Sequence, residues 1–367
     1  MKRQFSFIAI LICGYIYSQS PFHTLKMPQP SNKVTEIQTL GVTDIILKYS
    51  SPSLDSRDVW NDANVIPRNG TPYPWRAGAN MNTTIEFDTE LTIEDLKIKK
   101  GKYGLHIIPN DKTKDYTVLL AKANDLWGSY YLDIEKDISY KFNVRDTICP
   151  FTEKLDFEFY HKSDSTMILA LEWGIKRISM RVAVDLKETV INRLRSELRG
   201  INTYRWEAWH DAAQWCMEND INLEEALSWI NRSINGVGNN QFGGQKNITN
   251  LTMKARIAKK LKKQDLYDET INEALSLNSY SAQQAHDFTM YLFRNKQYSA
   301  ALKFNKKAIQ FHNEWFIKFN FIISNYLEGN HKVVRRELKN LSVPEWFTDR
   351  FNTIKEQLIK RTYHLPD

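Results

Sequence analysis

The segment YPWRAGAN, Tyr73–Asn80, holds the residues whose types and spacing best suit binding chemistry. If this segment is extended, Arg76, Gly78 and Asn80 point to one side, because successive side chains alternate between the two sides of a strand. A guanidinium can donate two parallel hydrogen bonds to a carboxylate or phosphate, and glycine lets the backbone approach a ligand closely. The pattern predicts a small polar notch that could hold an anion.

The same residues also have a purely structural interpretation. Arg76 could pair with a buried carboxylate, Asn80 could cap a turn, and Gly78 could pack beneath an aromatic ring. In that case the notch would stabilise the fold and would bind nothing. The sequence leaves both interpretations open.

Three further residues complete the set of ligand-binding candidates: Arg57, Trp75 and His106. If the strands that carry them are neighbours, Arg57 and His106 could converge with Arg76 on one anion. A lone histidine in a strand is, however, more often a structural residue. The eight histidines show no HxH or HExxH spacing, and no serine lies in G-x-S-x-G, so the sequence predicts no metal, no other cofactor and no catalytic residue that can be named.

An antiparallel sheet is predicted to position these candidates. Apolar residues alternate with polar ones in DIILKY (44–49), TTIEFD (83–88), KLDFEFY (154–160) and RISMRVAV (177–184). Alternation of this kind is typical of strands with one buried and one wet face. The runs DYTVLLAK (115–122) and TMILALEW (166–173) are more continuously apolar, as central strands are. About eight short strands in all indicate a β-sandwich or β-barrel over residues 20–185.

The pattern changes to a period of 3.6 residues after Asp185. Consecutive amphipathic segments of about 12–16 residues predict short helices joined by tight turns. Aligning Ala226, Thr270 and Ala301 gives spacings of 44 and 31 residues, which bracket the roughly 34-residue tetratricopeptide period. Residues 186–367 are therefore predicted to form tetratricopeptide-like helical hairpins, with a non-repetitive helical bundle as the alternative.

The first 19 residues have the pattern of a secretory signal peptide. Lys2 and Arg3 precede the apolar run FSFIAILICGYIY (5–17), which is too short to span a bilayer as a helix. We expect an exported protein, periplasmic or extracellular, with no membrane span after cleavage. With only three cysteines it is not a disulfide scaffold.

The charge pattern argues against nucleic acid as a partner. Residues 1–185 carry 23 basic and 23 acidic side chains, so the net charge of +7 arises in the remainder. The one dense basic run, KKLKK at 259–263, is amphipathic and lacks the interleaved aromatic residues of a nucleic-acid groove.

Several motifs together resemble the bacterial family known as domain of unknown function 2911. They are IILKYSSPS with the later Arg57, WRAGANMNTTIEF, GKYGLHIIP, the Leu126-Trp127-Gly128 turn and LALEW. The resemblance covers roughly Gln38–Asp185, and the helical continuation is similar to longer members. Asp55-Ser56 depart from the Lys-Gly that usually precedes the arginine. The resemblance implies an exported β-rich domain and no known reaction.

Two classes of function remain. The first is a non-enzymatic binding or scaffolding protein, whose β domain holds a ligand or partner and whose helical repeats bind a protein or peptide. The second is a hydrolase or isomerase that acts on a small anionic substrate through Arg57, Arg76, Asn80 and His106. Convergence of those side chains in one open cleft would favour the enzyme.

Overall fold

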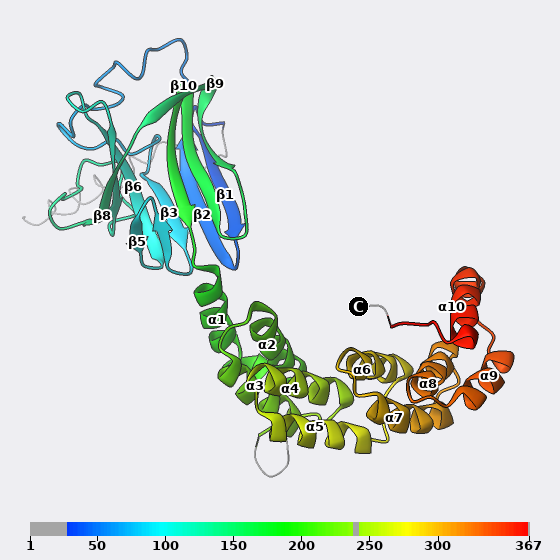
Figure 1. Ribbon diagram of the computed structural model, residues 1–367. Helices are drawn as coiled ribbons and strands as arrows, with labels where there is room; N and C mark the ends of the chain where they lie inside the picture. Colours follow the sequence, from blue (N-terminus) through cyan, green and yellow to red (C-terminus); the bar gives the residue numbers. More distant parts are fainter. Residues whose placement is uncertain (1–27, 238–241, 366–367) are drawn as a thin grey trace, which may run out of the picture. The chain divides into compact units, whose positions relative to one another are not determined.

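The computed structural model describes residues 28–237 and 242–365, and the chain divides into two compact units between Val190 and Ile191 (Figure 1). The sequence places this boundary at Asp185, a few residues earlier. Each unit has a hydrophobic core of its own. The predicted signal peptide, residues 1–19, lies outside the described residues.

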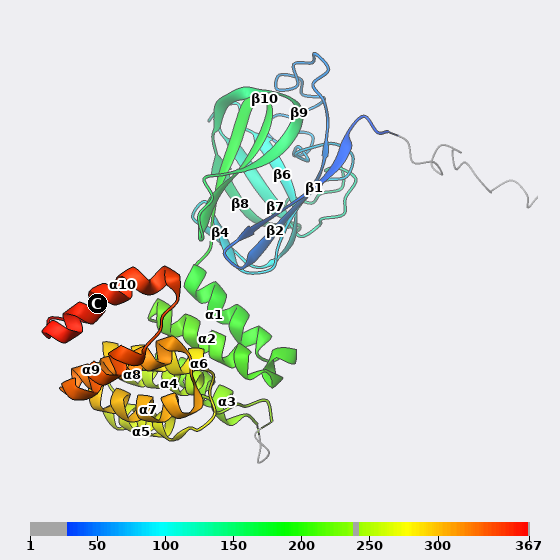
Figure 2. The same cartoon turned by 90° about the vertical axis from the view of Figure 1, so that its right-hand side faces the viewer.

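The first unit consists of two antiparallel sheets that face each other (Figure 2). The strands are β1 (Asn32–Leu40), β2 (Thr43–Ser51), β3 (Thr83–Phe87), β4 (Leu91–Ile93), β5 (Leu96–Ile98), β6 (Gly101–Pro109), β7 (Tyr116–Ala121), β8 (Ile138–Val144), β9 (Asp146–Tyr160) and β10 (Thr166–Ala183). One sheet has the order β1-β2-β3-β6-β7-β8 and the other β5-β4-β10-β9. Both sheets keep open edges, so the β-sandwich prediction is confirmed and the barrel alternative is wrong.

The alternation that predicted the strands also defines the core between the sheets. In β2, Ile45, Leu47 and Tyr49 are buried while Lys48 is exposed. The ring of Tyr49 meets that of Phe157 from β9, edge to face, at 4.9 Å between centroids. Contacts of this kind join the inner faces of the two sheets and remove apolar surface from water.

Strand β10 is longer than the sequence indicates. Its two predicted parts, TMILALEW and RISMRVAV, form one strand of 18 residues that pairs with the 15-residue β9. The strand continues through Gly174, which has a φ of +66° and lies where the register with β9 shifts. Such a bulge tolerates a residue with positive φ without ending the strand.

The chain from Leu186 onward consists of helices, most of them joined by short turns, and α1 crosses the boundary between the two units. They are α1 (Leu186–Glu197), η2 (Ile201–Tyr204), α2 (Trp206–Asn219), α3 (Leu223–Asn235), α4 (Ile248–Lys260), α5 (Gln264–Ser276), α6 (Ala282–Arg294), α7 (Tyr298–Phe311), α8 (Trp315–Leu327), α9 (His331–Asn340), η3 (Glu345–Phe347) and α10 (Thr348–Lys360). From α2 to α9 they pair as consecutive hairpins, as predicted, and α2, α4, α6 and α8 also contact one another in series (Figure 1).

The hairpins are nearly regularly spaced along the chain, and the sequence alignment misplaced one equivalent position by three residues. The first helices begin at Trp206, Ile248, Ala282 and Trp315, which are 42, 34 and 33 residues apart. The buried residues at the fourth position of the second helices are Ala226, Tyr267, Ala301 and Val334. The equivalent of Ala301 is thus Tyr267 and not Thr270. The wider first spacing comes from the long connection between α3 and α4.

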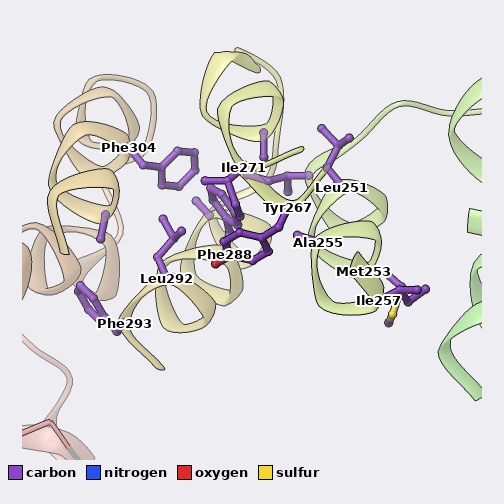
Figure 3. Close-up of a cluster of buried hydrophobic side chains, with 14 of the residues drawn as sticks. Leu251, Met253, Ala255, Ile257, Tyr267, Ile271, Phe288, Leu292, Phe293 and Phe304 are labelled. Carbon is purple, nitrogen blue, oxygen red and sulfur yellow. The ribbon is translucent and has the colours of Figure 1, made fainter. Parts of the chain in front are cut away.

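Side chains from neighbouring hairpins form one continuous core. Figure 3 shows Leu251 of α4, Tyr267 of α5, Phe288 and Leu292 of α6 and Phe304 of α7 side by side, all of them buried. Phe288 meets Phe304 edge to face at 5.0 Å. Each hairpin therefore depends on its neighbours to cover its apolar face, as in stacked helical repeats.

Two observations bear on membrane and redox chemistry. None of the helices in residues 28–237 and 242–365 is long and apolar enough to cross a membrane. Cys149 and Cys216 are buried free thiols in different units.

Candidate functional site

The Tyr73–Asn80 segment is not extended, so the condition under which Arg76, Gly78 and Asn80 would point to one side is not met. Trp75 pairs with β6 through two backbone hydrogen bonds of 2.8 Å with Ile107. Single backbone hydrogen bonds also connect Ala79 to Ser50 of β2 and Arg76 to Thr83 of β3. Ala77 and Asn80 have φ values of 53° and 60°, so the chain bends at both. The segment is a loop that starts at the sheet and folds back on itself.

This loop holds Arg76 by its own backbone. Nη1 of Arg76 donates a hydrogen bond of 2.7 Å to the carbonyl oxygen of Asn80. No carboxylate in the described residues forms an ion pair with Arg76, so the predicted pairing with a buried acid is wrong. Gly78 lies against Ser50 and Thr83 and not beneath an aromatic ring. The guanidinium, partly exposed, keeps donors that the loop does not use.

Two tyrosines form an aromatic wall beside Arg76. Cζ of Arg76 lies 5.1 Å from the ring centroid of Tyr130, which is 52% exposed. The ring of Tyr73 meets Tyr130 edge to face at 4.7 Å. Hydrogen bonds from Tyr73 and Arg76 and the charge of Arg76 lower the pKa of Tyr130. Tyr73, Arg76, Asn80, Gly128 and Tyr130 are called the Arg76 site below.

The loop that carries Tyr130 is fixed to the Arg76 segment by one asparagine. The side-chain oxygen of Asn82 accepts a hydrogen bond from the backbone N–H of Leu126, and the backbone N–H of Asn82 donates to the carbonyl of Leu126, both at 3.0 Å. Gly128 follows with a φ of +70°, directly against the guanidinium of Arg76. The two segments thus form one surface, although they are about 50 residues apart.

His106 lies beneath this surface, in strand β6. Its side chain is fully buried, and Nδ1 is 2.7 Å from Oγ of Ser129, which is also buried. Its Nε2 has no hydrogen-bond partner among the described residues. Burial, and secondarily the positive charge of Arg76, lower the pKa of His106 to about 4. His106 is therefore neutral at pH 7 and has no direct access to a ligand.

Trp75 belongs to the core and not to the surface. It is 3% exposed, stacks on Trp173 at 6.1 Å with an interplanar angle of 9°, and meets Trp60 edge to face at 5.7 Å. An aromatic cluster of this kind fixes the backbone on which Arg76 is mounted. Trp75 can thus position the site without touching a ligand.

Arg57 does not join the others. Its Nε and Nη2 donate to the carbonyl oxygens of Leu54 and Ser53, at 2.9 and 2.7 Å. No hydrogen bond or ion pair links it to Arg76, Asn80 or His106 in the part of the chain described. The structure therefore brings Arg76 together with the backbone of Asn80, places His106 below them, and separates Arg57.

Sequence reasoning missed Tyr73, Gly128, Ser129 and Tyr130. The signal was present in YPWRAGAN and in the GSYY that follows Trp127, where exposed aromatic residues adjoin a glycine. The sequence could not show that the loop with Arg76 and the loop with Tyr130 contact each other. Within residues 28–237 and 242–365, no group of three His, Cys, Asp or Glu side chains is arranged to bind a metal ion.

The fold and site define a two-sheet β domain with an arginine and two tyrosines at the meeting point of two loops. Residues 30–182, which form most of this domain, match the family described as Protein of unknown function (DUF2911). The match includes the WRAGAN and Leu126-Trp127-Gly128 motifs and ends before the helices. No curated protein and no solved structure matches the chain.

Proposed function

We propose that this chain is an exported binding protein whose β domain captures a small anionic ligand, or an anionic group of a partner, at the Arg76 site. The observation that carries the proposal is a partly exposed guanidinium held between an Asn80 carbonyl and the ring of Tyr130, with no carboxylate partner among residues 28–237 and 242–365. Such a guanidinium can donate a pair of hydrogen bonds to a carboxylate or phosphate.

The surroundings of Arg76 favour a ligand that also has apolar surface. Met81, Trp127 and Tyr131, which adjoin the site along the chain, are 40%, 56% and 81% exposed. Large exposed apolar side chains of this kind can contact the apolar part of a ligand.

For the helical unit we propose binding of a protein or peptide along its stacked hairpins. The C-terminal segment of the chain supports this, because it already docks there. Tyr363 and Leu365 pack against the helical core, and the hydroxyl of Tyr326 in α8 donates a hydrogen bond of 3.2 Å to the carbonyl of Tyr363. An extended peptide could make equivalent contacts.

The enzymatic alternative, a hydrolase or isomerase, has one observation in its favour. His106 and Ser129 are in hydrogen-bond contact, as a general base and a nucleophile would be. Both side chains are sealed from solvent, however, at 0% and 1% exposure. Binding without chemistry therefore receives more support.

Calorimetric titration of the full chain with inorganic phosphate and with citrate tests the binding proposal. We expect Arg76→Ala to weaken binding of the preferred anion by at least about tenfold. Arg76→Lys should keep only part of the wild-type affinity, because lysine lacks the planar guanidinium that donates two parallel hydrogen bonds. Arg57→Ala is the matched control and should bind as the wild type does. Equal binding by all four proteins, or none by the wild type, would refute the proposal.

A further inference from the structure

A second polar site lies in the β unit, at a cleft of about 230 Å³ whose lining includes Trp60, Arg68, Lys114, Asp115, Asp146 and Lys176. We call it the Lys176 cleft. None of the residues that the sequence singled out lines it.

Lys176 is held in a fixed position at the cleft. Its Nζ donates hydrogen bonds to Oδ2 of Asp146, at 2.8 Å, and to the hydroxyl of Tyr116, at 3.0 Å. Nζ also lies 5.5 Å from the ring centroid of Trp60. Burial lowers the pKa of Lys176, but the hydrogen bonds with Asp146 and Tyr116 outweigh it, and the pKa is raised. The ammonium group is therefore charged and keeps one N–H for a ligand.

Two carboxylates at the cleft each keep one oxygen available. Asp146 receives the hydrogen bonds of Tyr116 and Lys176 at Oδ2, which leaves Oδ1. Asp115 accepts hydrogen bonds from the Asn110 amide, at 2.7 Å, and from the Thr113 hydroxyl, at 2.5 Å, both at Oδ1, which leaves Oδ2. The cleft thus offers acceptors as well as donors.

A further donor stands at the rim. Lys114 is exposed and makes no ion pair within the described part of the chain. Arg68 directs Nε and Nη2 to Asp111, at 2.9 and 2.6 Å, and its Nη1 is 3.5 Å from the carbonyl of Trp60. Cationic donors and carboxylate acceptors therefore alternate around one small space.

The same mixture continues in a neighbouring cleft. This second cleft, of about 400 Å³, shares Asp115 with the first and is also lined by Glu94, Asn143, Arg145 and Ser179. Asp115 thus lies where the two clefts meet. Together they can accept a ligand longer than one small ring.

We propose that the two clefts bind a short carbohydrate chain, with Asp115 between successive sugar units. Each sugar hydroxyl both donates and accepts hydrogen bonds, so it is satisfied by a lining in which the two kinds of group alternate. A polyanion would face Glu94, Asp115 and Asp146, and a polycation would face the lysines and arginines. A glycan that lacks one of the matching hydroxyls leaves a polar side chain of the cleft without a hydrogen-bond partner, so the cleft binds it more weakly than the matching glycan.

An array of neutral and uronic-acid oligosaccharides, probed with the labelled full chain, tests the proposal. We expect binding to a subset of glycans, and we expect Asp115→Asn and Lys114→Ala each to weaken it by about tenfold. The side chain of Lys114 forms no ion pair or hydrogen bond with the described residues, so this variant should keep the fold even if Asp115→Asn does not. Lys112→Ala, in the same loop and outside the cleft, is the matched control.

Arg76→Ala should leave glycan binding unchanged. The glycan proposal and the anion-binding proposal for the Arg76 site can therefore fail independently of each other. A thermal-shift screen with free amino acids runs in parallel, because a zwitterion could also use paired cations and carboxylates. The proposal is overturned if no glycan binds, if amino acids bind in place of glycans, or if Lys114→Ala binds glycans as Lys112→Ala does.

Discussion

The guanidinium of Arg76 lies directly on Gly128. A Cβ atom added at Gly128 would be 2.4 Å from Cζ of Arg76, far inside van der Waals contact. The absence of a side chain at this position is thus what lets the Tyr130 loop close over Arg76. Gly128 also has a φ of +70°, which L-residues adopt at a cost.

The methyl group that Gly128→Ala adds should therefore displace the Arg76 side chain from its position. We expect the flexible arginine side chain to move aside, at a backbone cost of about 1–2 kcal/mol, and anion binding to fall as it does in Arg76→Ala. Gly329→Ala is the control, because Gly329 has a φ of +75° and a Cβ atom added there would meet no atom of the described residues within 4 Å. Urea unfolding and calorimetric titration measure the two effects. If Gly128→Ala binds the anion as tightly as the wild type does, the position of the Arg76 side chain does not determine anion binding.

Arg76→Ala should leave the fold nearly intact. The variant removes the hydrogen bond to the carbonyl of Asn80 and the contact with the exposed ring of Tyr130. It leaves no carboxylate of the described residues unpaired, so we expect a loss of about 1 kcal/mol. Arg177→Ala provides the contrast, because Nε of Arg177 pairs at 2.5 Å with Glu172, whose side chain is 8% exposed. Its removal should cost at least about 2 kcal/mol. Equal melting temperatures for these two variants, or a larger drop for Arg76→Ala, would contradict the assignment.

The pKa of His106 should be well below that of an ordinary histidine. NMR titration, with the signal assigned through His106→Gln, should give a pKa of about 4, and Arg76→Ala should raise it by removing a nearby positive charge. Because the folded-state pKa is below the unfolded one, the unfolded state binds more protons between about pH 6.5 and 4. Stability from neutral His106 is therefore complete above about pH 6.5 and falls as the pH drops towards 4. A normal pKa, or one that decreases in Arg76→Ala, would mean that His106 is not buried beneath Arg76.

Local patterns predicted the elements well, and they failed where distant segments meet. Ile45, Leu47 and Tyr49 identified β2 and its inward face because a strand alternates at every second residue. No such rule connects Arg76 to Tyr130, since that contact depends on the Asn82–Leu126 hydrogen bonds between two loops. The sequence therefore pointed to the arginine and missed its aromatic partner.

The Lys176 cleft was missed for a related reason. The two predicted runs TMILALEW and RISMRVAV cover residues 166–173 and 177–184, so Lys176 lies outside both of them. In the structure the bulge at Gly174 continues the strand, and Lys176 pairs in register with Ile148 of β9, close to Asp146. A positive-φ glycine inside a strand has no hydrophobic pattern of its own, so periodicity alone cannot distinguish it from a chain reversal.

The junction between the two units should be the first site of proteolytic cleavage. Asp185, Lys187 and Glu188 are exposed, and the hydrophobic cores on either side are separate clusters. Limited trypsin digestion should cut after Lys187, because this exposed basic residue lies beside the boundary between the two units. We expect two stable fragments on a gel, and two transitions when the full chain is heated in a calorimeter. A single cooperative transition, together with resistance of this junction to trypsin, would mean that the units fold as one.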